Sequence, residues 1–242
     1  MSSIDLNADV GESYGRWQLG DDARLIPHLS SANVACGFHA GDALTLQRTV
    51  ALCAASNVAI GAQVSYHDLA GFGRRAIDID APALAADVLY QIGALDALAR
   101  AAGSSVTYVK PHGALYHRCL TDTAQAQAVI DAVVAFGRLP VMTMSEGALA
   151  DAARTASLTV IREGFADRGY GPDGRLIPRG QPGDLLVDSL SVAEQSVRLA
   201  RSGTIDSLCL HGDTPGASDH AAAVRAALAE AGIQVRSAHG TH

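Results

Sequence analysis

The stretch Asn33-Val34-Ala35-Cys36-Gly37-Phe38-His39-Ala40-Gly41-Asp42 joins an apolar run to a helical run, and this pattern recurs down the chain. Gly37 and Gly41 permit positive φ and close backbone approach, so they indicate a shaped loop rather than a linker. Asp42 is a good N-cap and predicts a helix over residues 43–56. The stretch therefore predicts a strand, a polar loop and a helix in succession.

Short apolar runs alternate with helical runs along the whole sequence. Strands are expected at residues 3–8, 31–35, 58–62, 106–109, 140–144, 158–161, 207–210 and 233–235. A capping box at Ser191 and Glu194 predicts the start of one of the later helices. Such alternation implies parallel pairing and right-handed crossovers. An open doubly wound sheet is an alternative, but polar residues follow nearly every strand rather than one switch point. We therefore expect a single α/β domain over residues 1–242, a (β/α) barrel of seven or eight parallel strands.

Composition and charge exclude several classes of protein. Apolar residues make up 48% of the 242 residues and charged residues 18%, which is enough for a sizeable core. The net charge of -7 and the lack of a long basic run argue against nucleic acid or an anionic membrane as the partner. The N-terminus has no signal-peptide pattern, and no apolar stretch is long enough to span a bilayer. The four cysteines are widely spaced, so we expect reduced thiols in a cytoplasmic protein.

Polar side chains cluster where the expected strands end. In a (β/α) barrel the loops after the strands form one catalytic face, so these side chains are expected to converge. Taken singly, each has a simpler explanation, such as a helix cap, a surface ion pair or a loop hydrogen bond. The candidates that share this position are Asn7, Asp9, Glu12, Asn33, His39, Lys110, His112, Glu163, Asp167, Arg168, His211 and Asp213.

Lys110 is the single lysine among 18 basic residues. It stands before Pro111, which restrains the backbone at the lysine. A partly buried lysine there could orient an anion, stabilise an oxyanion or act as a base. A Walker A loop needs Gly-Lys-Ser/Thr, so this chain has no P-loop. Further cations stand on two loops, Arg75 at the end of residues 71–75 and Arg179 within residues 169–182, a long loop expected to face the site.

The carboxylates and histidines suit general acid–base work near neutral pH. An aspartate with several histidines could also hold a divalent metal, although no HExxH or comparable local spacing is present. Both alternatives stay open from the residues alone.

The sequence resembles the LamB/YcsF family of bacterial proteins, the A subunits of 5-oxoprolinase. The matching stretches lie in family order at residues 5–12, 32–42, 71–75, 109–116, 165–168 and 211–215. The resemblance implies a barrel of the glycoside hydrolase/deacetylase kind. It also implies ATP-dependent opening of 5-oxo-L-proline to L-glutamate, together with two further subunits, B and C. One departure is Gln63, which stands where the family usually has histidine and which cannot be protonated as a base.

We expect the partner subunits to activate the lactam with ATP, and this chain to bind the ring and direct water to it. The residues expected to be catalytic are Asp9 or Glu163 as base, His39 or His112 as acid or relay, and Lys110 for the developing charge. The residues expected to bind substrate are Asn7, Glu12, Asn33, Arg75, Asp167, Arg168, Arg179, His211 and Asp213. The rival hypotheses are a stand-alone metal-dependent deacetylase and a non-catalytic subunit that binds a small acid.

Overall fold

The computed structural model describes residues 2–212, 214 and 216–238. Strands and helices alternate along this part of the chain. The elements are β1 (Ser3–Val10), α1 (Asp22–Leu25), η1 (Ile26–His28), β2 (Ser31–Ala35), α2 (Ala43–Ala55), β3 (Ala59–Val64), α3 (Ala81–Ala101), β4 (Val106–Pro111), α4 (Gly113–Arg118), α5 (Thr123–Phe136), β5 (Val141–Thr143), α6 (Ala148–Thr155), β6 (Val160–Phe165), α7 (Ser189–Ser202), β7 (Ser207–Leu210), α8 (Ala217–Glu230) and β8 (Gln234–Val235).

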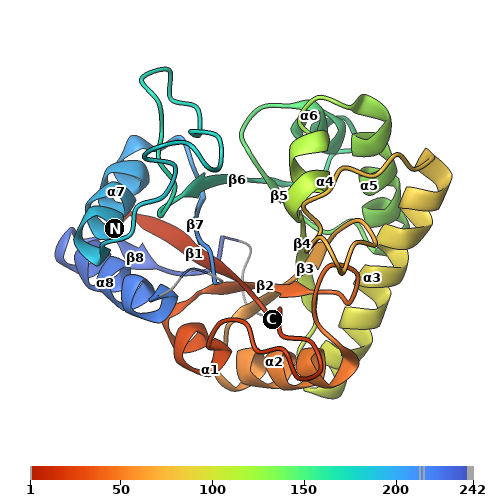
Figure 1. The fold of residues 1–242 in the computed structure, drawn as a ribbon, viewed down its shortest axis with the longest axis horizontal. Coiled ribbons are helices and arrows are strands. Elements are labelled where there is room, and N and C mark those ends of the chain that lie inside the picture. The colour runs from red at the N-terminus through yellow and green to blue at the C-terminus, as the bar shows by residue number, and fades with distance from the viewer. Residues whose placement is uncertain (1, 213, 215, 239–242) are drawn as a thin grey trace.

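The strands close into a barrel. Within the described residues, β1 to β7 pair in sequence order, and the ring closes because β1 pairs in parallel with both β2 and β7. β8 pairs with the first residues of β1, at Ser3 and Ile4. Figure 1 shows the helices surrounding the strands, with α3 and α5 on the side opposite α7 and α8. The prediction of a (β/α) barrel is confirmed, with seven strands in the closed ring.

Strand β1 shows how the barrel interior differs from its outside. Successive side chains of a strand point to opposite faces. Ile4, Leu6, Ala8 and Val10 belong to the hydrophobic core that the helices cover. The alternate polar residues, from Asp5 to Asp9, contact side chains of other strands inside the ring. The barrel therefore has an apolar outer layer and a hydrogen-bonded polar interior.

The floor of the interior is built around Asp5, which is almost fully buried. Its carboxyl accepts hydrogen bonds from Ser30 Oγ at 2.6 Å, from Ser31 Oγ at 2.7 Å and from the hydroxyl of Ser207. Burial raises the pKa of Asp5, and the three serine hydroxyls partly oppose that rise. These bonds tie β1 to the start of β2 and of β7.

A close approach of two strands fixes the middle of the interior. The Tyr108 ring lies against the backbone of Gly61, where any Cβ would overlap it. The Tyr108 hydroxyl donates to Asn33 Oδ1 at 2.6 Å. Gly61 is therefore needed for space, and Tyr108 fills the barrel beneath the strand ends.

Three expectations about elements differ from the structure. The capping box expected at Ser191 lies inside α7, because Asp188 caps this helix and accepts from the Ser191 N–H at 2.9 Å. The short helix α4 was not expected, since its six residues are too few for a periodic signal. Strand β6 begins at Val160 and runs to Phe165, so Glu163 lies within the strand rather than after it. In the part of the chain described, no helix is long and apolar enough to cross a membrane.

Candidate functional site

The Lys110 ammonium group lies inside the barrel. Its Nζ is 2.7 Å from Glu163 Oε1, 3.2 Å from Asp9 Oδ1 and 3.2 Å from Cys209 Sγ. These partners stand on β6, β1 and β7, none of which is a neighbour of β4 in the sheet. The ammonium group therefore contacts side chains of three strands that do not pair with β4, and polar side chains from around the ring meet at Lys110.

Charge at this centre is fixed by the lysine. Burial alone would lower the pKa of Lys110, yet Asp9, Cys209 and Glu163 hold it well above its ordinary value. Burial alone would raise the pKa of Asp9, and Lys110, with smaller effects of His112 and His211, holds it well below its usual range. Lys110 is thus a permanent cation suited to donate hydrogen bonds, and Asp9 is a permanent anion.

Two asparagines hold this centre in place. Asn33 Nδ2 donates to Asn7 Oδ1 at 2.6 Å and to Asp9 Oδ1 at 2.9 Å. Asn7 Nδ2 donates to Ser207 Oγ at 2.7 Å, which links the centre to the floor. Both asparagine side chains are fully buried, so they position Asp9 and Lys110 from below.

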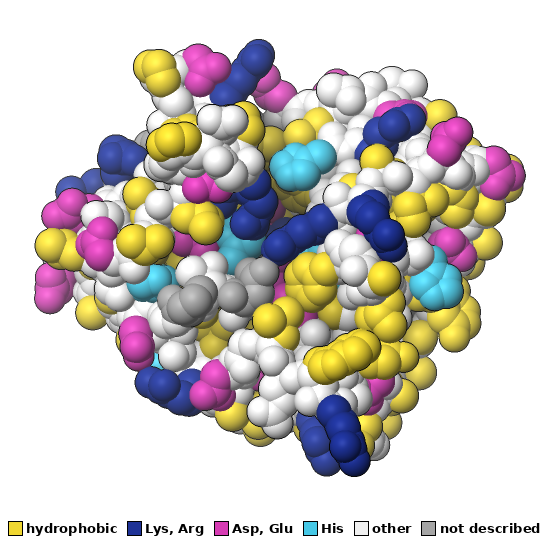
Figure 2. Space-filling model, in the orientation of Figure 1, with side chains coloured by type: hydrophobic (Ala, Val, Ile, Leu, Met, Phe, Trp, Pro, Cys, Tyr) yellow, Lys and Arg dark blue, Asp and Glu magenta, His cyan; other side chains and the backbone are white. Residues whose placement is uncertain are grey.

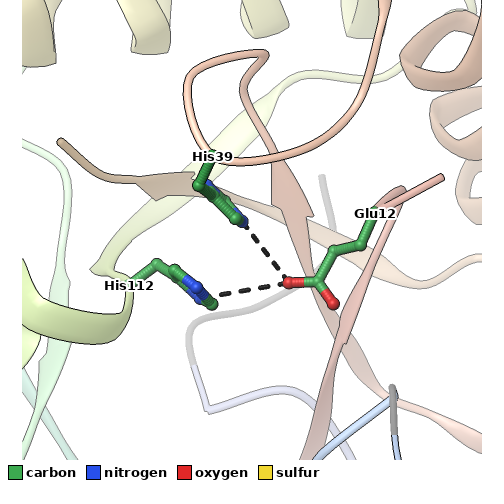
Figure 3. A group of neighbouring side chains, drawn as sticks. All are labelled: Glu12, His39 and His112. Carbon is green, nitrogen blue, oxygen red and sulfur yellow. Dashed lines mark hydrogen bonds and ion pairs between the residues drawn. The ribbon is translucent and has the colours of Figure 1, made fainter. Parts of the chain in front are cut away.

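Glu12, His39 and His112 form a second group at the barrel mouth (Figure 3). Glu12 Oε1 is 3.4 Å from His39 Nε2 and 3.9 Å from His112 Nδ1. The two imidazole rings stack, with centroids 3.9 Å apart and an interplanar angle of 12°. Burial lowers the pKa of each histidine to about 4, so both are neutral at pH 7.

This group is the one cluster of His, Cys, Asp and Glu in the described residues with the spacing of a metal site. Its available donors are fewer than three. His112 Nε2 bonds the Phe72 carbonyl at 3.0 Å, so it carries the proton, and its Nδ1 accepts from Gln63 Nε2 at 2.9 Å. Catalytic zinc usually takes three protein ligands. With Nδ1 engaged by Gln63, only Glu12 and His39 Nε2 remain, and the cluster fits an ion poorly.

Asp167 and His211 form a carboxylate–imidazole pair. His211 Nδ1 is 2.9 Å from Asp167 Oδ1, and the His211 backbone N–H donates to Asp167 Oδ2 at 2.9 Å. Burial alone would lower the pKa of His211, but Asp167 raises it above 6.5. Because the carboxylate holds Nδ1, the imidazole presents Nε2 for proton transfer. The sequence placed both residues at strand ends without indicating that they pair.

The predicted arginines lie in different surroundings. Arg168 donates to the carbonyls of Ile177 at 2.7 Å and Asp184 at 3.0 Å, so it braces the loop between β6 and α7. Arg179, on that loop, is exposed and close enough for its charge to oppose protonation of His211. Arg75 is exposed and pairs with Asp68. Asp213 lies outside the described residues.

Tyr116 is a residue of the mouth that the sequence did not single out. Its ring packs with Phe165 and Cys209, and with Tyr170 and Leu176 of the long loop. Tyr116 lies within the stretch 109–116 that carries the family resemblance, and this was the available signal. Figure 2 shows Lys, Arg and His side chains gathered near the centre of one face of the molecule.

Comparisons with known proteins agree with this architecture. The sequence model of the LamB/YcsF family matches residues 4–242. A protein of Streptomyces avermitilis, named as the A subunit of 5-oxoprolinase, is 54% identical over 245 residues, covering 96% of this chain and 98% of the relative. Another of that name, from Kocuria rhizophila, is 52% identical over 250 residues, covering 98% and 99% of the two chains.

Solved structures agree as well. The lactam utilization protein of Thermus thermophilus superposes with a TM-score of 0.92 at 41% identity, covering 97% of this chain and 99% of that chain. The Bacillus cereus polysaccharide deacetylase Bc1974 superposes with a TM-score of 0.53 at 11% identity, covering 98% and 92%, which shows a shared deacetylase-like fold. This chain belongs to the LamB/YcsF family.

Proposed function

We propose that this chain is the A subunit of a 5-oxoprolinase and carries the site where the lactam ring of 5-oxo-L-proline is opened to L-glutamate. The names of its close relatives support this proposal. The observation that carries it is that the Asp167–His211 pair lies close enough to the Lys110 centre for the charges of His211 and Asp9 to interact. Hydrolysis of an amide requires proton transfer and stabilised charge, and these two groups supply both.

His211 acts as the proton carrier in this proposal. Its Nε2 takes a proton from the attacking water while the new C–O bond forms at the lactam carbonyl. The same nitrogen returns the proton to the ring nitrogen as the C–N bond breaks, so the proton balance closes. Asp167 holds the imidazole orientation and stabilises the imidazolium in between. The alternative roles of Asp9 and Glu163 as base remain predictions, and the strong ion pair of Asp9 with Lys110 favours His211.

The proposal assigns ATP chemistry to two partner subunits. A five-membered lactam recloses readily, because its amine and carboxyl are held at high effective concentration. Coupling to ATP therefore favours the open product. This chain has no P-loop, so the partners are proposed to phosphorylate the carbonyl oxygen with ATP. Breaking the C–N bond then leaves an acyl phosphate on the new carboxyl group, and a second water converts it to glutamate and inorganic phosphate. Arg179 is proposed to bind the substrate carboxylate at the rim of the site.

The test uses the purified chain, its two candidate partners, ATP and 5-oxoproline, with glutamate formation followed over time. His211→Gln and Asp167→Asn are expected to lower the rate by about a hundredfold or more. Asp9→Asn is expected to lower it as well, because Lys110 loses a charged partner. Glutamate formation at the wild-type rate by folded His211→Gln would remove His211 from the mechanism. Binding of 5-oxoproline without turnover, with all partners present, would instead support a regulatory role for this chain.

A further inference from the structure

The hydroxyl of Tyr116 is buried, yet among the described residues it makes no well-formed hydrogen bond. Buried polar atoms in proteins are nearly always hydrogen-bonded, and an exception needs an explanation. The ring itself is held firmly. It meets Phe165 edge to face, with centroids 6.2 Å apart, and packs against Cys209. The ring is therefore fixed in position by apolar contacts, which hold its hydroxyl beside the Glu163 carboxylate.

The neighbouring carboxylate of Glu163 is in a similar state. Its side chain is fully buried, and within the described structure neither oxygen accepts a well-formed hydrogen bond, although Oε1 is 2.7 Å from the Lys110 ammonium. Burial, and then the charge of Glu163, raise the pKa of Tyr116 well above its ordinary value, so the phenol keeps its proton. A fixed donor thus stands within reach of a fixed acceptor, without a well-formed hydrogen bond between them.

A lactam is complementary to such a pair. In a five-membered lactam the amide is cis, so the carbonyl oxygen and the N–H lie side by side on one edge of the ring. That edge offers one acceptor and one donor. Open-chain secondary amides are almost always trans and present these groups on opposite edges. A side-by-side donor and acceptor therefore distinguish a lactam from an ordinary peptide bond.

We propose that Tyr116 and Glu163 together bind the amide edge of the substrate ring, with the Tyr116 hydroxyl donating to the carbonyl oxygen and the Glu163 carboxylate accepting from the ring N–H. This inference rests on the proposed function and adds the residue that selects a lactam. The apolar wall of Phe165 and Leu176 beside Tyr116 suits the ring methylenes. The Tyr116 hydroxyl contacts the reacting carbonyl, and the hydrogen bond between them becomes stronger as negative charge develops on the carbonyl oxygen.

Calorimetry on the complete three-subunit enzyme without ATP tests this pairing. The ligands are 5-oxo-L-proline, its ring-oxygen lactone analogue, which lacks the N–H, and L-proline, which lacks the carbonyl. The variant is Tyr116→Phe, which keeps the apolar ring. The matched control is Tyr90→Phe, because Tyr90 is 65% exposed on α3. Thermal unfolding of both variants establishes that they are folded.

Tyr116→Phe is expected to weaken binding of 5-oxoproline and of the lactone by about tenfold, and to leave L-proline binding unchanged. Tyr90→Phe is expected to bind all three ligands as the wild type does. Unchanged 5-oxoproline binding by Tyr116→Phe, or an equal loss for all three ligands, overturns the inference. If the wild-type enzyme with ATP forms no glutamate, the proposed function fails instead, so the two failures are distinguishable.

Discussion

The Nζ atom of Lys110 lies 2.7 Å from Oε1 of Glu163, so a cation of β4 meets an anion of β6 across the barrel interior. Asp9 is the second carboxylate on the same ammonium, at 3.2 Å. A single lysine therefore neutralises negative charge that two strands bring into a buried space. Its removal has consequences for stability as well as for activity.

Lys110→Met is expected to lower the free energy of unfolding by about 3–5 kcal/mol, because it leaves two buried carboxylates without their cation. Denaturant unfolding at neutral pH measures the change. The double variant Lys110→Met with Glu163→Gln is expected to recover part of the loss, since it removes one of the two anions. A single variant as stable as the wild type would show that the carboxylates are neutralised by another group.

The Asp167–His211 pair predicts a defined pH dependence. The pKa of His211 is raised above 6.5, so its contribution to stability is full below pH 6.5 and is lost as the pH rises through the folded value. The pKa of Asp167 is lowered below 3.8, despite burial, by His211, so its contribution is present above pH 3.8 and is lost as the pH falls through the folded value. The pair is therefore most stabilising between pH 3.8 and 6.5.

Asp167→Asn is expected to cost about 1.5–3 kcal/mol at about pH 5.5 and distinctly less at about pH 8.5. Unfolding at the two pH values measures the difference, and NMR titration of His211 should show its pKa falling in the variant. A cost independent of pH, with an unchanged His211 titration, would contradict the charged pair.

Gly61→Ala is expected to destabilise the barrel by about 1–3 kcal/mol, because the new methyl group would displace the Tyr108 ring. Gly93→Ala is the matched control. Gly93 lies within α3, where a Cβ meets no atom within 4 Å, so alanine there should stabilise by about 0.5–1 kcal/mol. Thermal and denaturant unfolding of both variants check the opposite signs.

The contact between Gln63 and His112 predicts how much zinc the protein binds. The Gln63 amide engages His112 Nδ1, so Gln63→Ala is expected to free a third ligand beside Glu12 and His39. After incubation with zinc and desalting, elemental analysis should find about one equivalent in the variant and much less in the wild type. Equal and stoichiometric zinc in both proteins would refute the blocking role of Gln63.

The barrel could be predicted from the sequence because each strand, with the polar residues that follow it, is visible in a short stretch of residues. The recurrence of this pattern along the chain then indicated the fold. Lys110 and Asp9 were expected to meet for the same reason, and the structure brings them together. The pairing of Asp167 with His211 depends on the register between β6 and β7, where Phe165 stands opposite Cys209. Closure of the barrel sets that register. It cannot be predicted from the sequences of β6 and β7 alone.

The orientations of side chains on the loops also could not be predicted from the sequence. Arg168 and Arg179 are both cations of one long loop region, but Arg168 turns back to bind loop carbonyls, whereas Arg179 faces outward near His211. The partners of Arg168 are backbone atoms, whose positions depend on how the loop closes. Residue type alone therefore did not distinguish an arginine that braces the loop from an arginine that stays exposed.

The alternation of β1 has a consequence for how this chain can evolve. A shift of one residue in the pairing of β1 would turn Asp5, Asn7 and Asp9 outward against the apolar faces of the helices. It would also leave the ammonium group of Lys110 facing aliphatic side chains. The polar side chains thus specify the strand alignment while they prepare the chemistry. Substitutions of these side chains would alter the candidate site and loosen the fold together, so the two properties cannot change independently during evolution.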